Sequence, residues 1–160
     1  MNMHSENHLK KLKKVRIMAD YQFGKGIGKI LFPENVKFIL SKTKRIRQIL
    51  CDEKRIATVR AKDGMLTLSI DGANTIHKAT QSPHMRVVIL DDAVPFVAKG
   101  KTVFSKHVID IDMNLRALEE VMITDKSGKL CATGQLLLAP MEIIELEQGV
   151  AVDVRCGIDS

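Results

Sequence analysis

The chain of 160 residues reverses the sign of its charge near its middle. Residues 1–82 carry 17 Lys and Arg against 7 Asp and Glu, whereas residues 83–160 carry 8 against 12. The change coincides with Thr80-Gln81-Ser82-Pro83, a polar stretch ending in proline that is typical of a domain boundary. A chain of this length has room for two small domains. The sequence therefore predicts a basic domain over residues 1–82 and an acidic domain over residues 83–160.

A basic half of this size indicates a polyanionic partner, RNA or DNA, although a solvated surface that only aids solubility is the alternative. The cysteines Cys51, Cys131 and Cys156 lie far apart without a CxxC pair, and the histidines show no metal-ligand spacing. We therefore expect no disulfide framework, no metal site and no cofactor. The sequence also shows no secretory signal and no membrane span, so we expect a cytoplasmic protein without a membrane partner.

The first half has the pattern of a helix packed on an antiparallel sheet. Apolar residues recur at steps of three and four from His8 to Phe23, with lysines on the opposite side. The glycines Gly24, Gly26 and Gly28 follow, either ending this helix or forming a loop that brings lysines to a phosphate. Alternating or β-branched stretches then predict strands at residues 36–40, 45–51, 55–61 and 65–70, and a short helix at 71–76.

A cluster of cations lies on the predicted strands of this half: Lys42, Lys44, Arg45, Arg47, Lys54, Arg55 and Arg60. Arg45 and Arg47 are two residues apart and share a face of their strand. Closely spaced Lys and Arg side chains bind a phosphate backbone by displacing its counterions. Protection of an edge strand by charge is the alternative interpretation.

The second half changes to many short strands around brief helices. Strands are predicted at residues 86–90, 102–108, 121–124, 130–138 and 150–155, and helices at 91–100 and 141–147, with a polar connection at 109–118. Such a pattern is typical of a small closed barrel. The whole chain is therefore predicted to be an α+β protein.

The most specific signal in the acidic half is a local concentration of positive charge. Lys99, Lys101 and Lys106 cluster in sequence around Gly100, where a predicted helix passes into a strand. Glycine at such a point allows a ligand to approach the backbone closely. Solubility alone is a poor explanation for a single positive loop on a negative domain.

The stretch from Val87 to Gly157 resembles a PUA domain, a small RNA-binding barrel. The matching pieces are residues 93–108, 119–134 and 149–155. Upstream, Ala19-Asp-Tyr-Gln-Phe-Gly24, Leu31-Phe-Pro33, Arg45-Ile-Arg-Gln48 and residues 57–68 are similar to the domain that precedes the PUA domain in archaeal tRNA-guanine transglycosylase. The resemblance implies a PUA pseudo-barrel behind the small first domain. In that family catalysis belongs to a large barrel with aspartates and a zinc ion, and neither has a counterpart in this sequence.

The resemblance also implies a site. Lys99 belongs to it, Gly100 and Lys101 would contact an RNA backbone through amide and ammonium groups, and Lys106 and Arg155 would flank the groove. We expect Phe104 in the core. A pair with a nearby acid such as Asp153 is the alternative role for Arg155. The expected target is the acceptor stem and 3′ end of tRNA, whose A-form helix is read by shape, phosphate and 2′-OH.

These observations favour a non-catalytic RNA-binding protein, acting as an accessory or split subunit in archaeosine-type tRNA modification beside a catalytic transglycosylase chain. The alternative is a translation or ribosome-associated factor whose first domain docks a protein partner. A small hydrolase would need a Ser-His-Asp or Cys-His group at a plausible spacing, which the sequence does not show.

Overall fold

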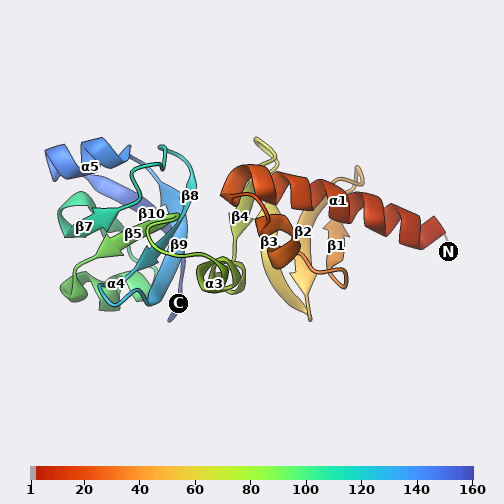
Figure 1. Cartoon of the computed structure of the whole chain (residues 1–160), viewed down its shortest axis with the longest axis horizontal. Coiled ribbons are helices and arrows are strands. Elements are labelled where there is room, and N and C mark those ends of the chain that lie inside the picture. The colour runs from red at the N-terminus through yellow and green to blue at the C-terminus, as the bar shows by residue number, and fades with distance from the viewer. Residues whose placement is uncertain (1–2) are drawn as a thin grey trace. The chain divides into compact units, whose positions relative to one another are not determined.

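The computed structural model describes residues 3–160, with side chains from Glu6 onward (Figure 1). The chain forms two compact units that divide between Ala79 and Thr80. Each unit has its own sheet, of four strands in the first and six in the second. The predicted α+β class, with an antiparallel sheet under a helix followed by a barrel-like sheet, is confirmed.

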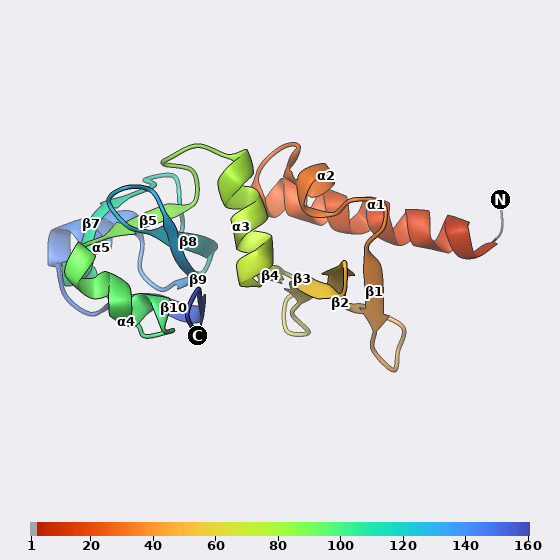
Figure 2. The ribbon, with the colours of Figure 1, turned by 90° about the horizontal axis from the view of Figure 1, so that it is seen from below.

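The first unit consists of three helices and a four-stranded antiparallel sheet. Its elements are α1 (Met3–Phe23), α2 (Ile27–Leu31), β1 (Lys37–Leu40), β2 (Ile46–Cys51), β3 (Lys54–Val59), β4 (Leu66–Leu68) and α3 (Ile70–Ala79). The strands follow one another in the order β1-β2-β3-β4, because each pair is joined by a short turn. Helix α1 runs over this sheet (Figure 2).

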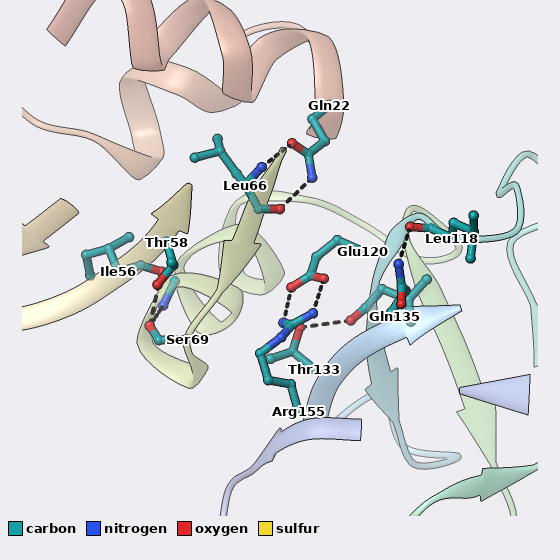
Figure 3. A network of polar contacts seen from close by, with 12 residues as sticks. Gln22, Ile56, Thr58, Leu66, Ser69, Leu118, Glu120, Thr133, Gln135 and Arg155 are labelled. Atoms are coloured by element: carbon teal, nitrogen blue, oxygen red, sulfur yellow. Dashed lines mark hydrogen bonds and ion pairs between the residues drawn. The ribbon is translucent and has the colours of Figure 1, made fainter. Parts of the chain in front are cut away.

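The apolar stripe of α1 explains how the helix is fixed. Leu12, Val15, Ala19 and Phe23 recur at three- and four-residue steps, and all four are buried. The side chain of Gln22 binds the backbone of strand β4. Its Nε2 donates to the Leu66 carbonyl at 2.7 Å and its Oε1 accepts from the Leu66 amide at 2.9 Å, the two hydrogen bonds that a neighbouring strand would make (Figure 3).

The glycine run after α1 does more than end that helix. A short helix, α2, follows at once, which the sequence did not predict. A side-chain carbon on Gly28 would lie 2.2 Å from the Arg16 carbonyl oxygen, so only glycine allows α2 to pack this closely against α1. The Gly28 amide donates to Asp20 Oδ1 at 2.6 Å, which ties the two helices together.

The second unit is a six-stranded sheet with short helices around it. Its elements are β5 (Arg86–Ile89), η1 (Asp91–Ala93), α4 (Val94–Ala98), β6 (Val103–Phe104), η2 (Ser105–His107), β7 (Val108–Ile111), β8 (Glu120–Thr124), β9 (Leu130–Leu136), α5 (Pro140–Leu146) and β10 (Val150–Gly157). The strand order is β6-β10-β9-β8-β5-β7, with β5 and β8 parallel and the other pairs antiparallel. Aliphatic residues such as Val87, Ile123 and Val152 form its core.

One prediction for this unit is wrong. The strand expected over residues 102–108 is interrupted by the 3-10 turn η2, and the connection expected over 109–118 contains most of strand β7. Ser105, at the start of η2, is buried, and its amide donates to the Gly149 carbonyl at 2.9 Å. The chain thus leaves β10 at this point and crosses to the opposite edge of the sheet, beside β5. Local alternation of residues cannot reveal such a crossing.

Candidate functional site

A groove of about 860 Å³ opens in the first unit. Helix α1 provides Lys10, Lys11, Lys14, Val15 and Met18 of its lining. The rest comes from the turn before β2, the start of β2, the end of β3 and the turn that follows β3. Its charged members are Lys44, Arg45, Arg47, Arg60, Lys62 and Asp63. The predicted residues Arg45 and Arg47 therefore both line this groove.

The charges in this groove are almost all of one sign. Asp63 is the only acidic residue among the described residues of the lining, and the Arg60 guanidinium pairs with it at 2.6 Å. A hydrogen bond from the Met65 amide, assisted by the charge of Arg60, holds the pKa of Asp63 below its usual value. The other seven cations of the lining have no carboxylate within ion-pair distance among the described residues. Uncompensated cations in a concave surface concentrate a positive potential and attract polyanions.

The uncharged part of the lining is aliphatic. It includes Val15, Met18, Ile46 and Val59, and no aromatic side chain from Glu6 onward lines the groove. Unpaired bases bind to protein surfaces mainly by stacking on aromatic rings. The groove is therefore better suited to the sugar-phosphate backbone of a nucleic acid than to stacked bases.

The sequence placed only part of this site. It singled out the strand cations but placed the lysines of α1 only on the side of the helix opposite its apolar residues. Lys10, Lys11 and Lys14 lie beside Arg45 and Arg47 because the apolar stripe of α1 fixes the rotation of the helix over the sheet. Three other members of the predicted cluster, Lys42, Lys54 and Arg55, do not line the groove.

In the second unit, Lys99, Gly100 and Lys101 form the turn between α4 and β6. Gly100 has a φ angle of 98°, a backbone conformation that favours glycine. There is room for a larger residue, because an added side-chain carbon would meet only Ser160, at an ordinary contact distance of 3.6 Å. The Gly100 amide donates to the Val97 carbonyl at 2.9 Å and the Lys101 amide to the Phe96 carbonyl at 3.1 Å. The expected amide contacts with RNA are therefore not available in this structure, but the ammonium groups of Lys99 and Lys101 are exposed.

Lys106 lies on the other side of the short strand β6 from this turn. Strand β6 pairs antiparallel with β10 through Phe104 opposite Val150 and Val103 opposite Val152. Lys101 precedes β6 and Lys106 follows it, so the two lysines lie at opposite ends of that strand. Lys99 and Lys101 thus flank Gly100 within the turn itself, and Lys106 follows β6 in the turn η2.

Arg155 lies on β10 and forms an ion pair that the sequence did not identify. Its two terminal nitrogens bind both carboxylate oxygens of Glu120 on β8, with Nη2 at 2.6 Å from Oε1 (Figure 3). The Glu120 side chain is only 4% exposed, whereas that of Arg155 is 28% exposed. The partner is therefore Glu120 and not Asp153, because the guanidinium reaches across β9 to the next strand.

Two aromatic residues near the Gly100 turn are exposed. Phe104 is 44% exposed and makes an edge-to-face contact with His107, so its expected place in the core is wrong. Phe96, whose carbonyl holds the Gly100 turn, is 63% exposed.

Among the described residues no helix is long and apolar enough to cross a membrane, and no group of three or more His, Cys, Asp or Glu is placed to hold a metal ion.

Comparisons with known families identify both units. Residues 13–83 match the patch-forming domain C2 of tRNA-guanine transglycosylase, and residues 85–158 match the PUA domain. The predicted likeness to this pair of accessory domains is confirmed.

Curated relatives agree with these domain matches. The chain is 44% identical over 147 residues to the tRNA-guanine(15) transglycosylase of Methanothermobacter thermautotrophicus, covering 91% of this chain and 22% of the relative. It is also 44% identical over 147 residues to that of Thermococcus kodakarensis, covering 92% of this chain and 25% of the relative. The chain thus spans about a quarter of the length of these proteins.

Solved structures share the fold along nearly the whole chain. A hypothetical protein of Pyrococcus horikoshii superposes with a TM-score of 0.74 at 19% identity, covering 94% of this chain and 92% of that one. A conserved PUA domain protein of Thermoplasma acidophilum gives a TM-score of 0.65 at 13% identity, covering 96% and 91%. At such identities the likeness concerns the fold.

Proposed function

We propose that this chain, which joins a transglycosylase C2 domain to a PUA domain, binds tRNA and serves as a non-catalytic accessory or split subunit in tRNA modification. Its curated relatives are named tRNA-guanine(15) transglycosylases, which supports a role in archaeosine-type modification. The catalytic step would then belong to a transglycosylase chain with which this protein associates.

The basic groove of the first unit is the observation that carries this proposal. Seven of its cations have no acidic partner among the described residues, and its remaining lining is aliphatic. Each ammonium or guanidinium group that contacts a phosphate releases condensed counterions, which is the main source of affinity for a nucleic-acid backbone. In this proposal the groove provides most of the affinity for RNA.

The Gly100 turn of the PUA unit provides a second contact. Lys99 and Lys101 present exposed ammonium groups on both sides of Gly100 and are proposed to bind the phosphates of the acceptor stem or the 3′ end. Lys106 would extend this contact from the other end of β6. Arg155 would act mainly by holding Glu120, with its partly exposed guanidinium at the edge of the surface.

A matched pair of double variants tests the proposal in the full chain. Lys14→Glu with Arg45→Glu reverses two exposed groove charges, whereas Lys13→Glu with Lys54→Glu reverses two exposed charges outside the groove. Both variants change the net charge equally. We expect the groove variant to bind a tRNA transcript on the order of tenfold or more weakly, at every tRNA sequence tested, because phosphate contacts carry no sequence information. An equal loss of tRNA affinity in the two variants would mean that binding depends on the total positive charge and not on the groove.

A separate experiment tests the second half of the proposal. Tagged protein is purified from cells, and the bound proteins and RNAs are identified. The proposal predicts tRNA together with a barrel-type transglycosylase chain. Recovery of ribosomal subunits without tRNA-modifying chains would instead support a translation-associated factor.

A further inference from the structure

One turn of α1 contains a side chain that the fold does not use. Three of the four residues Asp20–Phe23 have structural partners: Asp20 accepts from the Gly28 amide, Gln22 holds Leu66 of β4, and Phe23 is buried. Tyr21 is 87% exposed, although it lies between them. It is also the only tyrosine of a chain without tryptophan.

Helical geometry places Tyr21 on the same side of α1 as two lysines of the groove, beyond the residues that line the groove itself. It follows Lys10 by eleven residues and Lys14 by seven, close to whole numbers of helical turns, so the three side chains project from one side of α1. Tyr21 lies about 10 Å beyond Lys14 along the helix axis, at a rise of 1.5 Å per residue. Ile17, one turn before Tyr21 on the same side, is 59% exposed. Together Lys10, Lys14, Ile17 and Tyr21 form what we call the α1 ridge.

The chemistry of the α1 ridge complements that of the groove. Among the side chains that the structure describes, the groove offers cations and aliphatic groups but no ring on which a base could stack. Tyr21 supplies such a ring at the end of the line of lysines. Unpaired RNA bases stack on exposed aromatic side chains, and removing one such ring weakens binding by a measurable factor.

We propose that Tyr21 stacks on an unpaired base of the RNA whose phosphates occupy the basic groove. This inference rests on the proposed function and adds a base contact to a backbone-binding site. Because the ring is 87% exposed, it can receive a base without displacing other side chains. The phosphates bound by Lys10 and Lys14 would direct the RNA strand along α1, and a base leaving the helical stack would reach the ring.

The tyrosine content of the chain provides a direct assay. Because the chain has one tyrosine and no tryptophan, the intrinsic emission of the full protein reports on Tyr21 alone. Stacking on a base quenches tyrosine emission. We expect saturable quenching on titration with a tRNA transcript, after correction for light absorption with free N-acetyl-tyrosinamide in the same solution. Inorganic polyphosphate, which has the charge but no bases, should bind with little quenching.

Binding measurements with variants complete the test. Tyr21→Ala should weaken tRNA binding by about five- to a hundredfold, the range expected for loss of one stacked base, whereas Tyr21→Phe keeps a ring and should stay within about twofold of the wild type. Ile30→Ala is the control for loss of an exposed apolar side chain, because Ile30 is 47% exposed on α2 and belongs neither to the α1 ridge nor to the groove lining; it should also stay within about twofold.

The outcomes separate this inference from the proposed function. If the wild type binds tRNA but its emission is unchanged and Tyr21→Ala binds as tightly, the stacking inference is wrong while the proposed function stands. Equal quenching by polyphosphate and tRNA would also overturn it, because no base would be needed. If the wild type binds no tRNA, the proposed function and the inference both fall.

Discussion

The ion pair between Arg155 and Glu120 gives a prediction that separates two roles of Arg155: stabilising the fold and contacting RNA. Arg155→Ala removes both hydrogen bonds to a carboxylate that is only 4% exposed. Breaking a buried pair by removing one partner costs about 3–5 kcal/mol, since the remaining charge has lost its compensation. Water reaches this site on the arginine side, whose side chain is 28% exposed, so we expect a value near the lower end, about 3 kcal/mol.

Such a loss is large for a chain of this size. Arg155 lies in the second unit, residues 80–160, and one kcal/mol lowers the midpoint temperature of a 60–100-residue domain by about 4–8 °C, so this unit should unfold about 12–24 °C lower in Arg155→Ala. Thermal unfolding followed by circular dichroism measures this shift, and urea denaturation gives the free energy. Arg116→Ala, at an exposed arginine in the same unit, is the control and should change the midpoint little.

A compensated double variant tests the cause of the loss. Replacing Glu120 with Leu together with Arg155 with Met removes both charges and should restore most of the stability, because no charge is left buried without a partner. The reasoning is refuted if Arg155→Ala unfolds at the wild-type temperature and instead weakens tRNA binding. Arg155 would then be an RNA contact whose bond to Glu120 contributes little to the fold.

Two further changes test local features of each unit. Gly28→Ala would place a carbon 2.2 Å from the Arg16 carbonyl oxygen, so α1 and α2 must separate; we expect a loss of about 3 kcal/mol in urea denaturation, and a wild-type midpoint would contradict the close approach. In the second unit, hydrogen bonds from the Ser127 hydroxyl and from nearby amides hold the pKa of Asp125 below its usual value, so its carboxylate stabilises the fold above the ordinary carboxyl range. That contribution to stability is lost as the pH falls through the lowered pKa of Asp125. Asp125→Asn should therefore be less stable than the wild type at neutral pH and as stable as the wild type in strong acid. A stability difference that does not change with pH would refute the assignment.

The regular elements could be predicted because their causes are local. The three- and four-residue spacing of Leu12, Val15, Ala19 and Phe23 predicts both α1 and its buried side. Alternation in residues 45–61 likewise predicts the β2–β3 hairpin. Each pattern records which side of one element faces the core.

The remaining features depend on residues far apart in the sequence. Helix α2 exists because Gly28 meets the backbone of Arg16, and no local signal reveals that approach. The partner of Arg155 is 35 residues away, on a strand reached only by crossing the sheet. The groove likewise combines α1 with β2 and β3, so the role of Lys14 became visible only in the folded unit.

The salt dependence of binding tests the groove most directly, because it counts the phosphates that the protein neutralises. The logarithm of the tRNA affinity is plotted against the logarithm of the salt concentration for the wild type, Lys14→Ala and Lys13→Ala. If Lys14 contacts a phosphate in the groove, its replacement should flatten the slope by about 0.7–0.9, while the Lys13→Ala line stays parallel to the wild type. A Lys14→Ala line that runs parallel to the wild type, or a Lys13→Ala line that flattens equally, would contradict the groove as the place where RNA is bound.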